Sequence, residues 1–447
     1  MSPAATGRMV SEEGTAAPAA IGAYAAALQA LELLKLIGGE LPDALVDKEV
    51  FIDAGHHRHW VTKFVRNPRC RFDHESWEIK PVAELSVAEA LALANPHGGT
   101  PALSVEGDGF VTALTCPGCG VRRERSPRLR KRLAERDWIC GHCGKRLLVT
   151  GFDLLEQLSG SALSAPDLSA SLFELGLRPG DLFCVGSGAD RCDRFQLELP
   201  PAGAGSQGAT VVVVGLGNVG SQLAPLAARM PGVGRVVLID HDSYERKNLR
   251  AQAIRAADIG RAKALVQADR LREINPALNL VAIVDRFETV PLGFLRDAVL
   301  VACVDSRLAR QDVNRAAWRV GSPWIDAAVD GRELLVRVVV YSPGRQKPCL
   351  ECRWDDDDYA ALEQTTPCAL FGAGATDLRQ SGSREAEAPS GTGKTQLAAK
   401  NLVTALEPSV ALQRERGSEV GEDGEDREEG PPTDGVRTGT VSAKWEL

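Results

Sequence analysis

The sequence predicts an α/β fold built on a parallel sheet, and three observations lead to this prediction. Short apolar runs recur through the second half of the 447-residue chain, most of them separated by stretches that suit helices. The runs are apolar at nearly every position, as expected for strands buried on both faces. A glycine-rich turn follows the first run directly. The expected strands are VVVV (211–214), RVVLI (235–239), LNLVAIV (278–284), AVLVACV (298–304) and PWIDAAV (323–329), with LLVRVVVY (334–341) as an antiparallel addition.

Composition argues against several other classes of protein. Apolar residues make up 44% and charged residues 25%, which are ordinary globular values. The formal net charge of -8 argues against a protein that mainly coats nucleic acid or an anionic membrane. The apolar stretch 15–37 has two acids before it and three polar residues inside it, so we expect an amphipathic or buried helix and no membrane span. The cysteines occur largely as C-x-x-C pairs, which is typical of intracellular metal sites, and we expect a cytoplasmic protein.

Two of these pairs predict a zinc ribbon. Cys116-x-x-Cys119 and Cys140-x-x-Cys143 are separated by 20 residues, which is a usual spacing for four thiolate ligands of structural Zn²⁺. Eight basic residues lie between Arg122 and Arg136. They allow a nucleic-acid contact, but a solvated loop is the favoured interpretation, so nucleic acid is not an expected partner. The ribbon is expected to be structural or to dock a protein.

The glycine-rich turn predicts a nucleotide site. Gly215-x-Gly217-x-x-Gly220 follows VVVV and opens a helix, so backbone N–H groups can approach a phosphate closely. The next expected strand ends in Asp240, whose carboxylate can accept hydrogen bonds from ribose hydroxyls. These residues alone indicate only that a nucleotide binds, with NAD as the default.

Further motifs argue against NAD. They read IDHDSYERKNL (239–249), IGRAKA (259–264), INP (274–276) and VDSRLARQDVN (304–314). This order resembles the ThiF/MoeB/HesA superfamily, the bacterial relatives of ubiquitin-activating enzymes, over about 191–370. The resemblance implies a Rossmann-like domain that uses ATP and Mg²⁺ to adenylate the C-terminal glycine of a ubiquitin-like or sulfur-carrier protein, and it implies a homodimer.

The resemblance also implies roles for individual residues. Lys263 would contact the phosphates and Asp305 would hold Mg²⁺, because cations must offset charge on the transferring phosphoryl group. Asp240 would take the ribose within a D-x-D motif completed by Asp242. Asn248 and Arg310 would help to position the nucleotide and polyphosphate.

One motif departs from the family pattern. The family has N-L-x-R-Q, but this chain has Ala251 in place of the arginine, so either Arg250 substitutes for it or catalysis is weakened. A second family arginine, which reaches across a dimer, corresponds to Arg194. Cys368, in T-T-P-C-A-L, resembles the cysteine that takes the activated carboxylate as a thioester in ubiquitin-activating relatives.

The ends of the resembling domain occur in an unusual order. Cys349 and Cys352 match the family's first structural zinc pair, and the second pair is matched by Cys70 and His74 near the N-terminus. Residues 1–80 thus look like the back half of such a domain. Either the domain is circularly permuted, closing on itself or by swapping in a dimer, or the chain keeps the remnant of a first copy. A helix-like stretch at 395–413 favours the remnant.

Two functional hypotheses follow. The first is an adenylyltransferase, and the second is a degenerate binding or scaffold protein whose zinc ribbon docks a partner. The expected organisation is a segment resembling the C-terminal part of a ThiF-type domain (1–95), a zinc ribbon (100–150), a small mixed segment (151–190), a ThiF-type adenylation domain (191–413) and a disordered acidic tail (414–447).

Overall fold

The computed structural model describes the chain from 17 to 365 except for four short gaps, 40–42, 95–99, 187–191 and 200–207. These residues belong to one compact unit, 1–378. Cys368, the stretch 395–413 and the acidic tail lie outside the described residues.

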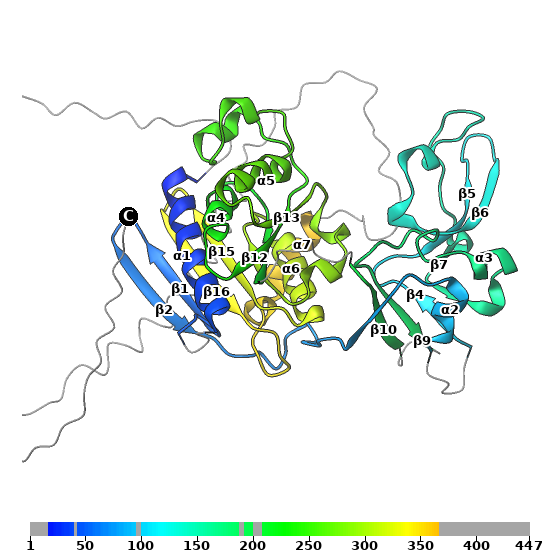
Figure 1. Ribbon diagram of the computed structural model, residues 1–447, viewed down its shortest axis with the longest axis horizontal. Helices are drawn as coiled ribbons and strands as arrows, with labels where there is room; N and C mark the ends of the chain where they lie inside the picture. Colours follow the sequence, from blue (N-terminus) through cyan, green and yellow to red (C-terminus); the bar gives the residue numbers. More distant parts are fainter. Residues whose placement is uncertain (1–16, 40–42, 95–99, 187–191, 200–207, 366–447) are drawn as a thin grey trace, which may run out of the picture. The chain divides into compact units, whose positions relative to one another are not determined.

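The largest element is an eight-stranded mixed sheet, drawn in blue, green and yellow in Figure 1. Five neighbouring strands pair in parallel, and three further strands are added antiparallel at one edge. This confirms the α/β fold and the six strands expected from the apolar runs. In spatial order the strands are β13 (Asn279–Ile283), β12 (Val233–Ile239), β11 (Ala209–Val214), β14 (Ala298–Ala302), β15 (Trp324–Asp330), β16 (Leu335–Tyr341), β1 (Lys48–Asp53) and β2 (Arg58–Lys63).

Helices cover both faces of this sheet, as its apolar strands require. One face packs against α1, α4 and α5, and the other packs against α6. Helix α6 begins where the Ser306 hydroxyl accepts a hydrogen bond from the N–H of Ala309, and it ends at the left-handed Gly321 (φ 73°). The helices of this part are α1 (Ala19–Gly38), α4 (Gly220–Ala227), α5 (Lys263–Ile274), α6 (Arg307–Val320) and α7 (Asp356–Thr365).

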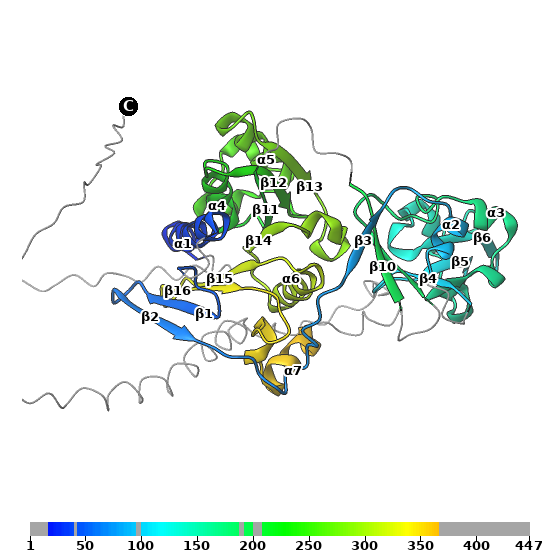
Figure 2. The same ribbon diagram turned by 60° about the horizontal axis from the view of Figure 1, so that its bottom comes forward.

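The N-terminal segment is built into this same sheet. Strand β1 pairs antiparallel with β16, and helix α1 packs on α4 and on β14, β15 and β16. Figures 1 and 2 both show α1 lying beside α4 over the sheet. The two parts that resemble the back and front of one family domain therefore join within a single chain.

Helix α1 is long and apolar enough to cross a membrane by length and composition. Core helices of soluble proteins and signal sequences share these two properties. Here 44% of its most apolar 18-residue window is buried in the structure. Ala25, Gln29 and Leu33 are fully buried against the sheet, so packing explains the apolar residues on this face of the helix, whereas Leu31 and Leu34 are exposed.

The segment from 79 to 199 forms two smaller sheets with their own apolar clusters. Cys184 and Cys192 form a disulfide between the paired strands β9 and β10. The five-stranded sheet contains β3 (Ile79–Val82), β10 (Cys192–Leu197), β9 (Leu182–Gly186), β4 (Ala102–Ser104) and β8 (Gln157–Ser159), with α2 (Val87–Ala92) and α3 (Ala165–Ser169). The three-stranded sheet contains β6 (Arg122–Leu129), β5 (Phe110–Thr115) and β7 (Leu154–Leu155).

Candidate nucleotide site and metal clusters

The glycine loop joins β11 to α4 at the point where the sheet's strand order reverses. Ligands of open α/β sheets bind at such a switch point. Gly215 has φ +86°, and a Cβ there would lie 2.7 Å from the Cys303 carbonyl oxygen. A Cβ on Gly220 would lie 1.9 Å from the Gly215 oxygen. Around Gly217, by contrast, the nearest atom to such a Cβ is 3.9 Å away, which leaves the middle of the loop open to a phosphate.

Asp240 closes this loop onto β12. Its Oδ2 accepts a hydrogen bond from the N–H of Leu216 at 2.7 Å, and its Oδ1 accepts one from Asp242 at 2.8 Å. The residue is only 9% exposed. We predicted a ribose ligand from its position after the strand; the structure gives the carboxylate a loop-holding role, with lone pairs left over.

Asp242 and Lys263 form the charged pair beside the loop. The Lys263 ammonium, at the first position of α5, lies 2.9 Å from Asp242 Oδ2 and 3.9 Å from Asp240 Oδ2. Burial works against ionisation of Asp242, but the ammonium lowers its pKa below the usual range. Because Lys263 is 9% exposed, its charge is little screened by water.

Tyr244 and Gln267, which the sequence did not indicate as site residues, support the glycine loop through hydrogen bonds. The buried Tyr244 hydroxyl donates to the Leu216 carbonyl oxygen at 3.0 Å and accepts from Gln267 Nε2 at 2.8 Å. Burial raises the pKa of Tyr244 above its ordinary value, which keeps the hydroxyl protonated. The sequence signal that could have identified Tyr244 is its position two residues after Asp242 in the same motif.

The turn that departs from the family pattern lies next to the loop. Asn248 Oδ1 accepts from the N–H of Glu245 at 2.7 Å and so stabilises the turn itself. Ala251 is buried, whereas Arg250 is exposed. The Gln252 side chain approaches Gly217, and its buried Oε1 has no hydrogen-bond partner in the described structure.

The expected magnesium ligand and the expected polyphosphate arginine have different surroundings. Asp305 is exposed, three residues after the end of β14. Arg310, however, donates to Asp326 Oδ1 at 3.0 Å and to the carbonyl oxygens of Val304 and Ala327. Asp326 is fully buried and also binds Arg337 at 2.7 Å. Arg310 thus ties the chain just after β14 to the middle of β15, and its contact with polyphosphate stays a prediction.

Arg194 lies on β10 of the five-stranded sheet. Its guanidinium stacks 4.5 Å from the centre of the Trp77 ring, which Arg319 also covers at 4.9 Å. Within this chain the residue therefore has a packing role, and its reach across a dimer stays a prediction.

The structure brings the predicted ribbon ligands together. The sulfurs of Cys116 and Cys143 lie 3.3 Å apart and those of Cys119 and Cys140 lie 3.7 Å apart. Sulfur atoms around tetrahedral zinc are about 3.7 Å apart, given its bond lengths, so the Cys119–Cys140 distance matches this geometry and the Cys116–Cys143 distance is shorter. A hydrogen bond from the Cys119 backbone lowers the pKa of Cys116 to about 6, which favours the thiolate. We call these four residues the ribbon cluster.

The second predicted set also meets, although its members come from opposite ends of the domain. Cys70 and Cys349 sulfurs lie 3.7 Å apart, and His74 Nε2 is 3.5 Å from both Cys349 and Cys352. His74 Nδ1 lies 3.0 Å from the Lys347 carbonyl oxygen, which places the proton on Nδ1 and leaves Nε2 for a metal. We call these four residues the clasp cluster.

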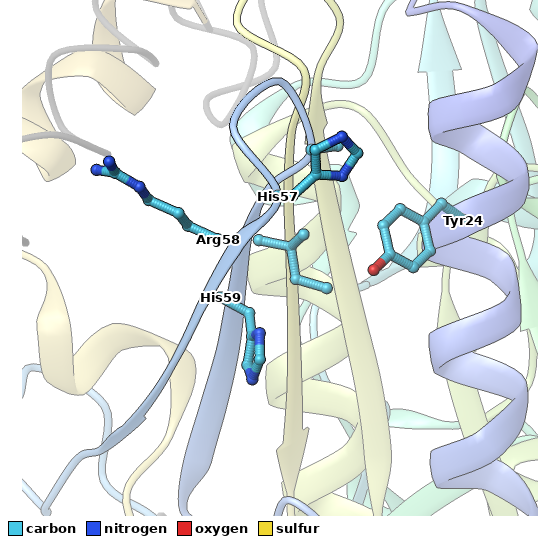
Figure 3. Close-up of a pocket in the computed structure, with 6 residues that line it drawn as sticks. Tyr24, His57, Arg58 and His59 are labelled. Atoms are coloured by element: carbon cyan, nitrogen blue, oxygen red, sulfur yellow. The ribbon is translucent and has the colours of Figure 1, made fainter.

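Figure 3 shows an open pocket between α1 and the β1–β2 hairpin. Tyr24 projects from the helix, His57 faces the same gap, and Arg58 points away from it. A third group, Asp240, His241 and Asp242, also has metal-ligand geometry, but the pocket histidines belong to none of the metal-ligand groups found in the described residues. We assign the pocket no role.

Comparison with known proteins agrees with this geometry. Residues 206–411 match the model of the ThiF family. The Sulfur carrier protein ThiS adenylyltransferase of Escherichia coli K12 is 32% identical over 150 residues, covering 33% of this chain and 59% of the relative. Ubiquitin-like modifier-activating enzyme 5 of Dictyostelium discoideum is 27% identical over 157 residues, covering 32% of this chain and 41% of the relative.

A crystal structure of E. coli MccB with succinimide is 25% identical, with a TM-score of 0.30, and covers 36% of this chain and 48% of that one. The chain thus spans 59% and 41% of the lengths of the two curated relatives. With the glycine loop, the Asp242–Lys263 pair and the family match in the same region, the chain carries a ThiF family domain in its C-terminal half.

Proposed function

We propose that the protein catalyses ATP-dependent adenylation of the C-terminal carboxylate of a ubiquitin-like or sulfur-carrier protein. One observation carries this proposal: a glycine loop at the switch point lies beside a largely buried lysine that is paired with the carboxylates of Asp240 and Asp242. The matched relatives are named as enzymes of this class.

The chemistry assigns work to the residues around the loop. A carboxylate oxygen of the carrier attacks the α-phosphorus, the bond to the β-phosphate bridging oxygen breaks, and pyrophosphate leaves. Backbone N–H groups at Gly217 and the Lys263 ammonium offset charge on the phosphates. The exposed carboxylate of Asp305 would hold Mg²⁺, which neutralises the leaving pyrophosphate.

Pyrophosphate exchange into ATP, measured with candidate carriers ending in Gly-Gly, tests the proposal. We expect Lys263→Ala and Asp305→Ala each to lower exchange by roughly 10²-fold or more. Lys247→Ala is the matched control, because this exposed lysine pairs with Glu245 at the surface. Exchange at the wild-type rate in Asp305→Ala would remove that residue from the mechanism.

One observation favours a second candidate, a nucleotide-binding scaffold. Ala251 replaces the arginine expected in the family motif, it is buried, and the neighbouring Arg250 is exposed. ATP binding without exchange for any carrier would favour the scaffold. Exchange that is lost in Arg250→Ala would show instead that Arg250 replaces the missing group.

We further propose that Cys368 receives the activated carboxylate as a thioester. The thiolate would attack the acyl adenylate, form a C–S bond and release AMP. A non-reducing gel after incubation with ATP and carrier should show a thiol-sensitive adduct that disappears in Cys368→Ala while exchange persists. An adduct that persists in this variant would exclude Cys368.

We also propose that the protein acts as a homodimer. If Arg194 acts across a homodimer, mixing Arg194→Ala with Lys263→Ala should restore part of the exchange, because one of the two mixed sites is intact. Mixtures as inactive as the separate variants would remove this role.

A further inference from the structure

A buried glutamine of the N-terminal helix contacts the end of β14, beside the glycine loop. Gln29 is fully buried, in a helix whose other inward side chains are mostly apolar. Its Nε2 donates to the Ala302 carbonyl oxygen at 2.9 Å, and its Oε1 accepts from the Cys303 thiol at 3.4 Å. These partners lie more than 270 residues away in sequence.

The contacted segment is the one against which the glycine loop closes. The N–H of Cys303 donates to the Val214 carbonyl oxygen at 2.8 Å, directly before the loop. A Cβ on Gly215 would meet the Cys303 carbonyl oxygen, and a Cβ on Gly220 would lie 3.2 Å from the Cys303 side chain. Any shift of Cys303 is therefore transmitted to both ends of the loop.

The start of the same helix is fitted to the middle of the loop. Asn218 Nδ2 donates to the Ala17 carbonyl oxygen at 2.7 Å. A Cβ on Gly22 would lie 2.1 Å from Asn218 Oδ1, so this close approach requires a glycine. The segment that contains helix α1 thus contacts the candidate nucleotide site at two places, the end of β14 and Asn218 of the glycine loop.

We propose that residues 17–29, which include the first half of helix α1, are part of the nucleotide site. Gln29 is a positioning residue, which holds the 302–305 backbone and the glycine loop in register. Burying an amide costs free energy unless its hydrogen bonds are made, so an apolar residue would serve plain helix packing equally well. The two hydrogen bonds of Gln29 are instead made with Ala302 and Cys303, at the end of β14 just before Asp305. This inference rests on the proposed function for its catalytic meaning, but nucleotide binding tests it directly.

The test uses Gln29→Met, which preserves volume but cannot donate to Ala302. We expect the dissociation constant for ATP, measured by calorimetry on the full chain, to rise about tenfold. Gln29→Leu, which has neither the donor nor the acceptor, is the second variant if the first fails to fold. Glu32→Leu is the matched control, since Glu32 is buried on the same helix but contacts Lys35 and the N–H of Leu45.

The control is expected to lower the unfolding temperature while leaving ATP affinity within twofold of wild type. Wild-type affinity in a folded Gln29→Met protein would overturn the inference, and so would an equal loss of affinity in Glu32→Leu. Absent exchange activity in the wild type would contradict the proposed function alone, because the affinity comparison would still be measurable.

Discussion

The ribbon cluster offers four thiols and the clasp cluster three thiols and one imidazole, and the two clusters connect the chain in different ways. Cys116 and Cys143 of the ribbon cluster are 27 residues apart, whereas Cys70 and Cys349 of the clasp cluster are 279 apart. The ribbon cluster closes a small sheet with its own apolar core. A metal held by the clasp cluster would tie the segment after β2 to the turn after β16, and so would fasten the N-terminal segment to the ThiF domain.

This difference predicts unequal contributions to stability. The entropy lost in closing a loop grows with the logarithm of its length, so a tenfold longer loop adds about 2 kcal/mol to the effect of a crosslink. Three of the clasp ligands are also buried among the core residues of the sheet, with His74 at 0% exposure against Trp318. The clasp cluster should therefore matter to the whole domain, and the ribbon cluster mainly to its module.

The largest expected effect is that of Cys349→Ser. We expect two zinc ions per wild-type chain and one in this variant, because the remaining three ligands leave an incomplete, buried site. The unfolding temperature should fall by roughly 10 °C, and ATP affinity should fall with it. Elemental analysis and calorimetry measure these quantities. A protein with one zinc ion, unchanged by the substitution, would remove the clasp cluster as a metal site.

The second effect is that of Cys140→Ser, which should remove the other zinc ion. Since the apolar cluster around this site is separate from those of the large sheet, ATP affinity should stay within about twofold. Limited proteolysis should then cut the chain within 110–150 first. If this variant lost nucleotide binding as fully as Cys349→Ser, the two clusters would not be independent, and the comparison would fail.

The sequence predicted those features whose signals are local. Continuous apolar runs indicated the parallel strands, and two C-x-x-C pairs indicated the ribbon cluster, because each pattern lies within a short window. The clasp cluster followed only from a family resemblance, since nothing in a lone Cys-x-x-x-His near the N-terminus specifies a partner at 349.

Other features could not be predicted because they depend on contacts between distant residues. The sequence placed Arg310 in a family motif but could not show that Asp326, within β15, lies beside its guanidinium. The hydrogen bond from the Leu216 N–H to the Asp240 carboxylate depends on the turn of the glycine loop, and the ribose contact of Asp240 stays a prediction. The partners of Gln29 lie across the sheet, and no sequence periodicity records such a hydrogen bond.

A smaller effect is expected from Arg319→Ala, next to the clasp cluster. This guanidinium binds both carboxylate oxygens of Asp73, at 2.7 and 2.8 Å, and covers the rings of Phe72 and Trp77. Truncating an arginine that forms a bidentate ion pair and stacks on aromatic rings removes packing as well as charge. We therefore expect the free energy of unfolding to fall by about 1–2 kcal/mol. Urea unfolding of the zinc-loaded protein measures it. Zinc content should stay at two per chain; loss of an ion would show that Arg319 controls metal binding.

The smallest effect is expected from Arg122→Ala, the corresponding arginine beside the ribbon cluster. It pairs with Asp153 at 2.5 Å and with Glu124 at 3.0 Å, and its own side chain is 48% exposed. The Asp153 side chain is only 7% exposed, but it keeps a hydrogen bond from the Thr150 hydroxyl when the arginine is removed. We expect a loss of about 0.5 kcal/mol, well below that of Arg319→Ala. Arg123→Ala, at the exposed neighbouring position on β6, is the control and should be near zero. If Arg122→Ala destabilised the protein as much as Arg319→Ala, the ribbon module would contribute to global stability, and the proposed difference between the two clusters would be wrong.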